Sequence, residues 1–298
     1  MAKEKTVGGI VRDLLSIGRV HIVAIGALGT FTFGYLFTGK QLFGLALISG
    51  LDWFLVNWLN RVVDLKEDTV NQIRGTDLVG KNPRAFAIFG FTVLGASFVA
   101  LHIFFPQITT LRAAYHALGL SYNYPFLPGK KRIKELYFWK NTASATGFLI
   151  TVFGYPLASS GGTFPPGITW ATVVIAGLFF FAFELSYEVI YDLRDAPGDA
   201  AANVRTYPVV HGEQGAVRII DTLIFASMAV LAVGYALNAV PWRLFIMIAA
   251  PLLQLGVYKR SLRRGITSAT CIGLTWLGAG LLFTYHLWIA FRLPGAGL

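Results

Sequence analysis

Two acidic clusters with matching spacing occur in this chain, one in each half. Asp64 and Asp195 are separated by 131 residues (195 − 64), and each is followed by another aspartate four positions later. Carboxylate and amide oxygens are the ligands that Mg²⁺ and Ca²⁺ prefer in proteins. The repeat therefore predicts a divalent-cation site built by both halves of the chain. The candidate metal ligands are Asn60, Asp64 and Asp68 in the first cluster and Asp192, Asp195 and Asp199 in the second.

Each cluster is expected at the end of a helix. Residues four apart lie on one face of a helix, so the three residues of the first cluster are predicted to line one face. Glu188 precedes Asp192 by four residues and extends the second cluster in the same way. Pro197 followed by Gly198 predicts that this second helix ends there, which places Asp199 on a turn.

The composition is that of a membrane protein. The 298 residues are 55% hydrophobic and 13% charged, with a mean hydropathy of +0.61, whereas soluble domains are about 25% charged. Apolar runs of about 17–25 residues are long enough to cross a bilayer as helices. They predict an all-α polytopic bundle of nine transmembrane helices, forming one domain over residues 1–298. The runs cover residues 20–37, 42–62, 85–105, 108–124, 142–160, 168–191, 215–237, 241–258 and 269–291.

The basic residues determine the predicted orientation. With a cytoplasmic N-terminus, 21 of the 25 lysines and arginines fall in cytoplasmic segments, as the positive-inside rule requires. The others, Lys40, Arg112, Arg243 and Arg292, fall outside. Residues 1–19 are predicted to form an amphipathic lead-in on the membrane surface. The sequence thus predicts an integral, multi-pass protein of the cell inner membrane or its equivalent, with both acidic clusters facing the cytoplasm.

The net charge and the single cysteine restrict the partners. The charge of +10 is attributed to topology and to attraction for anionic lipid or phosphate, and not to nucleic-acid binding. Cys271 alone supplies neither a disulfide framework nor a thiolate metal site. Nothing in the sequence indicates an oligomeric state.

Several polar residues are candidates for binding a substrate. Two interpretations of the basic run 130–134 stay open, because it either binds phosphate or only sets orientation. Polar side chains within membrane spans mark an interior or a functional site, so four residues at helix ends are predicted to line a substrate cavity. The phosphate candidates are Arg19, Arg74, Lys130, Lys131 and Lys134, and the cavity candidates are Asn57, Tyr187, Glu188 and Tyr191.

These residue types together fit one kind of chemistry. Carboxylates hold Mg²⁺, Mg²⁺ neutralises a diphosphate, and lysine and arginine bind the remaining phosphoryl oxygens. A diphosphate held in this way becomes a good leaving group, because negative charge is stabilised as it develops. An apolar bundle takes a hydrocarbon tail. The pattern therefore predicts a lipid diphosphate that ionises at its allylic carbon and is captured by a nucleophile.

The two motifs resemble those of the UbiA superfamily of intramembrane prenyltransferases. This resemblance implies nine helices around a central cavity capped by cytoplasmic loops. It also implies Mg²⁺-dependent transfer of an isoprenyl group from a prenyl diphosphate to a small aromatic or lipid-precursor acceptor. By motif, the first-cluster residues, Asp195 and Asp199 would organise Mg²⁺–diphosphate, with Asp192 as a helper. Tyr124 before Lys130 and Lys131 is similar to the family's Tyr/Lys stretch, and Arg19 is similar to its basic residue at the first span. The resemblance thus implies catalytic roles for Asp64, Asp195 and Tyr124.

The chain departs from the family pattern in its first motif. Many members have Asn-Asp where this chain has Asn60 followed by Arg61, and the basic run that follows the family's first motif is replaced here by residues 68–77. Two alternatives stay open. A relative in the superfamily transfers phosphoribose from its diphosphate to a lipid phosphate with similar metal motifs, and a cation-coupled transporter would also carry acidic ion sites.

Overall fold

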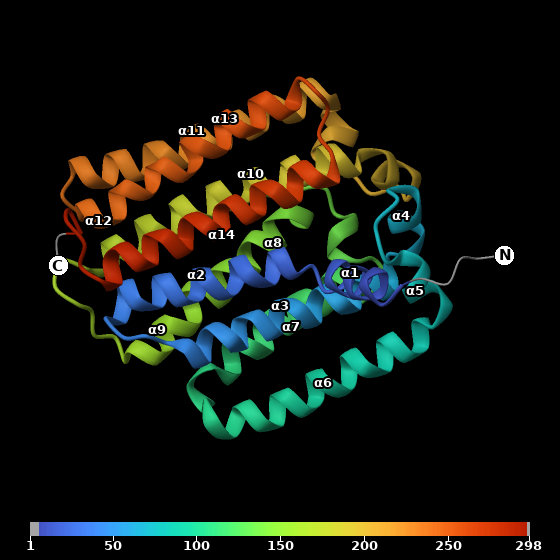
Figure 1. Ribbon diagram of the computed structural model, residues 1–298, viewed down its shortest axis with the longest axis horizontal. Coiled ribbons are helices and arrows are strands. Elements are labelled where there is room, and N and C mark those ends of the chain that lie inside the picture. The colour runs from blue at the N-terminus through green and yellow to red at the C-terminus, as the bar shows by residue number, and fades with distance from the viewer. Residues whose placement is uncertain (1–5, 297–298) are drawn as a thin grey trace.

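The computed structural model describes residues 6–296, which form an all-helical bundle without strands in that range. The long helices run side by side along the longest axis of the molecule, and the short helices α1, α4 and α5 gather at one end (Figure 1). Helix α1 and the C-terminal end of α14 lie at opposite ends of the bundle. The helices are α1 (Val7–Ile17), α2 (Val20–Thr38), α3 (Phe43–Val63), α4 (Leu65–Val70), α5 (Thr76–Lys81), α6 (Pro83–Phe104), α7 (Thr109–Asn123), α8 (Trp139–Phe148), α9 (Tyr155–Ser160), α10 (Trp170–Ala201), α11 (Tyr207–Ala236), α12 (Trp242–Phe245), α13 (Ala249–Leu262) and α14 (Ser268–Ala290).

Five of the described helices, α2, α6, α10, α11 and α14, are long and apolar enough to cross a membrane. The other predicted spans are also helical but differ in kind. Helix α3 carries polar residues, α7 has only 15 residues, and the run 142–160 is α8, a π-helical turn η3 (Leu149–Gly154) and α9. The run 241–258 is α12, η4 (Ile246–Ile248) and α13. The prediction of an all-α multi-pass bundle is confirmed, and the number nine stays a prediction.

The predicted lead-in over residues 1–19 begins outside the described residues. From Val7 it forms helix α1, whose apolar side chains Val7, Val11 and Leu15 are exposed. Arg19 follows in a left-handed conformation (φ 45°) that turns the chain from α1 into α2. This turn brings the basic side chain to the start of the first long helix.

Aromatic side chains fill the centre of the bundle. Phe33 on α2 lies between Phe153 and Phe180, with ring centroids 4.5 and 5.7 Å away. Helices α2 and α3 approach closely at Gly26, where an added Cβ would lie 2.6 Å from the Trp53 ring. Trp53 in turn stacks on Phe148 with centroids 3.9 Å apart. These contacts form an apolar core next to the site residues.

One group of charged side chains is fully enclosed in the bundle. Asp52 of α3 accepts hydrogen bonds from Arg112 of α7 (Nη2–Oδ1 2.6 Å) and from the Tyr155 hydroxyl (2.7 Å), and His116 Nε2 lies 2.9 Å from Oδ1. The side chains of Asp52 and Arg112 are 0% and 2% exposed. The sequence analysis counts Arg112 only as one of four basic residues on the non-cytoplasmic side. In the structure Arg112 neutralises a buried aspartate, which would be strongly unfavourable without a partner.

Both acidic motifs differ from the predicted helix geometry. Helix α3 ends at Val63, Asp64 leaves the helical conformation (φ −92°, ψ 19°), and α4 restarts at Leu65. The prediction that the helix of the second cluster ends before Asp199 is wrong, because α10 continues through Pro197 to Ala201. Pro197 has no N–H to donate, and the Gly198 N–H donates to Asn71 Oδ1 at 3.1 Å. The side chain from another loop supports the helix where its own bonding is weakened.

Candidate active site

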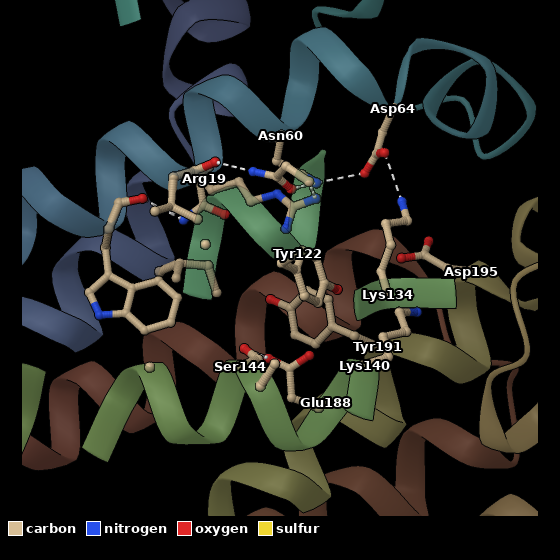
Figure 2. A pocket seen from close by; sticks show the side chains of 18 of the residues that line it. Arg19, Asn60, Asp64, Tyr122, Lys134, Lys140, Ser144, Glu188, Tyr191 and Asp195 are labelled. Atoms are coloured by element: carbon tan, nitrogen blue, oxygen red, sulfur yellow. Dashed lines mark hydrogen bonds and ion pairs between the residues drawn. The ribbon is translucent and has the colours of Figure 1, made fainter. Parts of the chain in front are cut away.

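The two acidic clusters line one cavity at the end of the bundle that holds α4. Its wall is formed by α3, α4, α7, α8 and α10, with the segment η2 (Ile133–Glu135) and the start of α2. Figure 2 shows Asn60 and Asp64 on one side of the cavity and Ser144 and Glu188 on the other. The cavity has an apolar part lined by Ile22, Ile25, Trp53, Val56 and Phe148. Its polar part contains all six predicted metal ligands, Asn60, Asp64, Asp68, Asp192, Asp195 and Asp199.

Hydrogen bonds fix the orientation of the Asn60 side-chain amide in the first cluster. Asn60 Nδ2 donates to Asp64 Oδ2 at 2.7 Å and to Asn123 Oδ1 at 2.8 Å. Arg19 Nη2 donates to Asn60 Oδ1 at 3.2 Å. The guanidinium predicted to bind phosphate therefore reaches the cavity, and it lies beside a predicted metal ligand.

Two basic residues from the loop after α7 neutralise the carboxylates around Asp64. Lys134 Nζ lies 2.7 Å from Asp64 Oδ1 and also pairs with Glu67. Arg132 Nη1 lies 3.3 Å from the same Asp64 oxygen. Burial and the nearby charge of Asp64 raise the pKa of Glu67, while the ammonium of Lys134 opposes this shift. The carboxylates at the mouth of the cavity are partly buried and close together, so they require nearby cations to stay charged.

Arg61 occupies the position at which the motif departs from its family pattern. Its Nη1 lies 2.8 Å from Asp68 Oδ2, and both side chains are less than 10% exposed. The cationic residue therefore pairs with the last aspartate of its own motif, and the first cluster carries less net negative charge than its aspartates suggest.

Lys140 performs the same role in the second cluster. Its ammonium lies 2.6 Å from Asp192 Oδ1 and 3.1 Å from Asp199 Oδ2. Asn141 Nδ2 donates to the other Asp192 oxygen at 2.9 Å. Asp195 is paired with its neighbour Arg194 (Nε–Oδ1 2.7 Å). Each aspartate of the two motifs is therefore paired with a basic side chain.

The donor set fits a metal that arrives with a diphosphate. Within residues 6–296, no three acidic, histidine or cysteine side chains are grouped closely enough to hold an ion by themselves. Mg²⁺ is usually bound through one or two carboxylates, several waters and substrate phosphates, and not by an all-protein cage. Carboxylates on opposite walls, each balanced by a cation, match this mode of binding because the phosphates supply the remaining oxygens.

The structure brings most predicted site residues together and leaves four apart. Asn57, Tyr187, Glu188 and Tyr191 line the cavity, as do Arg19 and Lys134. Four others are not among the lining residues, namely Arg74, Tyr124, Lys130 and Lys131. Arg74 pairs with Asp13 of α1 (Nε–Oδ1 2.8 Å), and Tyr124 packs near Phe91 and Phe126. Lys130, in a left-handed turn (φ 56°), and Lys131 are exposed.

Sequence reasoning missed several cavity residues. Lys140 looked like a residue that merely opens a helix, because its aspartate partners lie about 50 residues away in a different helix. Glu184 was detectable, since Glu184, Glu188 and Asp192 are four residues apart and must share one face of a helix. Other missed polar lining residues include Glu67, Asn71, Tyr122, Asn123, Ser144, Arg194 and Thr275.

Comparisons with known proteins identify the family of the chain. The model of the UbiA prenyltransferase family matches residues 20–270. A digeranylgeranylglyceryl phosphate synthase of Halobacterium salinarum is 28% identical over 239 residues, covering 78% of this chain and 80% of its own. The structure of a UbiA homolog from Archaeoglobus fulgidus bound to GPP and Mg²⁺ superimposes with a TM-score of 0.69 at 13% identity, over 94% of this chain and 99% of that one. A structure of a digeranylgeranylglyceryl phosphate synthase gives 0.60 at 15% identity, over 97% and 99%. The chain therefore belongs to the UbiA prenyltransferase family, as its two motifs predict.

Proposed function

We propose that this protein transfers an isoprenyl group from a prenyl diphosphate to a small hydroxyl-bearing acceptor within the membrane, with Mg²⁺ as cofactor. One observation carries the proposal. Aspartates from two motifs and the basic residues paired with them surround the mouth of a cavity that also has an apolar part. A charged headgroup and a hydrocarbon tail on one substrate match these two regions.

The polar region fits the diphosphate. Mg²⁺ supplies charge neutralisation that turns the diphosphate into a leaving group. Asp64 and Asp68 on one wall and Asp195 and Asp199 on the other would hold it, with Asn60 and Asp192 beside them. The proposal is supported by the A. fulgidus homologs of the same fold, which were solved with GPP or DMAPP and Mg²⁺.

The basic partners are positioned to bind phosphoryl oxygens. Lys134 and Lys140 already occupy the places near the carboxylates that a cation would take. With Mg²⁺ held by the aspartates, these two ammonium groups would be placed to contact the diphosphate oxygens. Arg19 lies on the opposite side of Asn60 from Asp64 and completes the positive lining.

The apolar region fits the isoprenyl chain and the cation formed from it. Trp53 and Phe148, stacked at 3.9 Å, contribute aromatic faces to the wall. Aromatic faces attract positive charge, and an apolar wall excludes water that would otherwise capture the carbocation.

The acceptor is proposed from the relative's name together with the site. The H. salinarum relative is a digeranylgeranylglyceryl phosphate synthase, which supports a glyceryl phosphate lipid precursor as the first acceptor to test and an aromatic hydroxyl compound as the second. We also place the cavity mouth on the cytoplasmic side. The predicted distribution of 21 of the 25 basic residues to that side supports this orientation.

The deciding experiment measures diphosphate release and prenylated product with protein purified in detergent. Farnesyl, geranylgeranyl and longer prenyl diphosphates are each offered with a glyceryl phosphate lipid or an aromatic acceptor, with and without Mg²⁺. We expect Mg²⁺-dependent product that Asp64→Ala abolishes. Reaction only with phosphoribosyl diphosphate and a lipid phosphate would replace this proposal with the phosphoribosyl alternative, and cation transport without turnover would favour the transporter.

A further inference from the structure

The cavity ends inside the bundle at a layer of large side chains. Helices α3, α7 and α10 run toward the cavity mouth, whereas α2 and α8 run away from it, so the chain direction shows which lining residue of each helix is innermost. On α10 this residue is Glu184. Within residues 6–296, no residue deeper on these five helices lines the cavity. On the other four helices the innermost lining residues, which we call the cavity floor, are Ile25 of α2, Trp53 of α3, Tyr115 of α7 and Phe148 of α8.

Trp53 connects two walls across this floor. Its ring stacks on Phe148 with centroids 3.9 Å apart, and it meets the Tyr115 ring edge-on with centroids 5.5 Å apart. Trp53 precedes Asn60 by seven residues on α3. At about 1.5 Å per residue, it therefore lies about 10 Å deeper than the first predicted metal ligand.

The indole of Trp53 is held in one position. Its Nε1 donates a hydrogen bond to Thr151 Oγ1 at 3.0 Å, and this bond is buried. On α2, Gly26 leaves room for the ring, because an added Cβ there would lie 2.6 Å from it. Displacing the ring would break a buried hydrogen bond and an aromatic stack, which is unfavourable. The floor is therefore a fixed limit to the cavity.

Gly147 leaves space beside the floor. It lies on α8 and lines the cavity. An added Cβ would lie 3.3 Å from the Tyr115 ring and 3.6 Å from the Trp53 ring. A methyl group at this position would therefore fit, but it would occupy the innermost part of the cavity.

We propose that Trp53 sets the maximum length of the isoprenyl chain that the cavity encloses, and that Gly147 keeps the last part of this space open. This inference rests on the proposed function and adds the feature that selects among donors. The diphosphate is held at the mouth, so each further isoprene unit brings the end of the chain closer to the floor. Chain length increases apolar burial until the chain reaches Trp53. A longer chain must then displace the packed indole.

The test measures donor binding as a function of chain length. Non-reactive geranyl, farnesyl, geranylgeranyl and longer prenyl thiodiphosphates are titrated calorimetrically into protein in detergent with Mg²⁺. The reference donor is the longest one that the wild type binds without loss of affinity, and it is compared with the next longer and the next shorter donor. The ratio of two Kd values in one preparation does not depend on the fraction of protein that is folded.

We expect the wild type to bind the next longer donor about tenfold more weakly than the reference donor. Trp53→Leu should remove this difference, because the smaller side chain extends the cavity. Gly147→Ala should weaken the reference donor about tenfold relative to the next shorter one. Effects of this size are typical of one or a few carbon atoms in an apolar pocket. A general loss of stability would not shift the preferred length in opposite directions.

Trp58→Leu is the matched control. Trp58 is on the same helix as Trp53 and is 9% exposed, but it stacks on Phe86 and is not among the lining residues. The variant should keep the length dependence of the wild type. Competition between two reactive donors in a single transfer assay should give product ratios that follow the same order in every variant.

Two results would overturn the inference and leave the proposed function intact. One is an unchanged length dependence in both Trp53→Leu and Gly147→Ala. The other is a shift in Trp58→Leu equal to that in Trp53→Leu, which would assign the effect to loosening of α3. Length-dependent binding with the expected shifts but without product would reject only the proposed function. A wild-type protein that binds no prenyl thiodiphosphate would reject both.

Discussion

Asn71 accepts a hydrogen bond from the backbone N–H of Gly198, with Oδ1 3.1 Å from the nitrogen. The two residues are 127 positions apart in the sequence. Asn71 follows the first acidic motif, and Gly198 lies just before the last aspartate of the second. This contact therefore joins the two motifs across the cavity mouth and helps to set the distance between the two walls that carry the proposed metal ligands.

Gly198→Ala should disrupt this contact. An added Cβ would lie 2.4 Å from the Asn71 amide, which forces the loop or the helix to move. We expect a loss of about 1–3 kcal/mol of stability, typical of overpacking, with reduced turnover because the motifs separate. Thermal unfolding in detergent and Mg²⁺-dependent activity measure the two effects.

The same contact provides an internal control. Asn71→Ala removes the atoms that would clash, so the double variant Asn71→Ala/Gly198→Ala should be more stable than the sum of the single effects predicts. Strict additivity would show that Asn71 is not what restricts residue 198.

Asp64→Asn and Asp195→Asn should each lower turnover at least about 100-fold while the protein remains folded and inserted in the membrane. Each change removes a negative charge from a wall of the cavity, while the amide keeps the volume. Asp221→Asn is the matched control, because Asp221 pairs with Lys259 at 2.6 Å outside the cavity. Turnover near the wild-type value in either site variant would reject its role as a metal ligand.

Lys134→Met should raise the KM for the prenyl diphosphate about 10–100-fold, as expected for the loss of one charge-assisted contact. Lys134 is buried at the cavity mouth, whereas Lys131, three residues earlier, is exposed. Lys131→Met should therefore leave the KM close to the wild-type value. An equal rise in both variants would mean that the whole basic run binds the donor, as one interpretation of the sequence holds.

Lys140→Met should make stability depend on the metal. Removing the buried ammonium leaves Asp192 and Asp199 uncompensated, at a cost of about 3–5 kcal/mol. Mg²⁺ with inorganic diphosphate should then raise the unfolding temperature more in the variant than in the wild type, because the ion replaces the lost charge. The comparison uses buffers with a chelator or with Mg²⁺.

Lys259→Met is the control for this experiment, since its pair with Asp221 is partly exposed and contributes less than about 1 kcal/mol. An equal Mg²⁺ response in Lys140→Met and wild-type protein would contradict the idea that lysine and metal share the site.

The class of fold and the two acidic motifs were predictable because they depend on local patterns. Apolar runs of bilayer length and the position-by-position match of Asp64 with Asp195 need no knowledge of tertiary structure. The residues paired with these aspartates were not predictable in the same way. The ion pairs of Lys140 and Arg61 depend on where their side chains lie in the folded protein. The sequence alone does not show whether a lysine at the start of a helix faces solvent or an aspartate.

The errors have specific physical causes. Pro197 and Gly198 normally end a helix, but a side chain from a distant loop supplies the missing support. Lys130 and Lys131 have the charge that phosphate needs, yet the turn at Lys130 directs the chain so that Lys134 enters the cavity. The charge pattern alone could not show which of the three lysines in residues 130–134 lines the cavity.

The enclosed pair of Asp52 and Arg112 also couples two helices that are not consecutive in the chain. A charged side chain inside a membrane is unfavourable, and each of these two charges is offset by the other. Asp52 is on α3 and Arg112 is on α7, with α6 between them in the chain. Helices α3 and α7 are therefore unfavourable in lipid when they are separated, and the ion pair favours a bundle in which these two helices stay packed together.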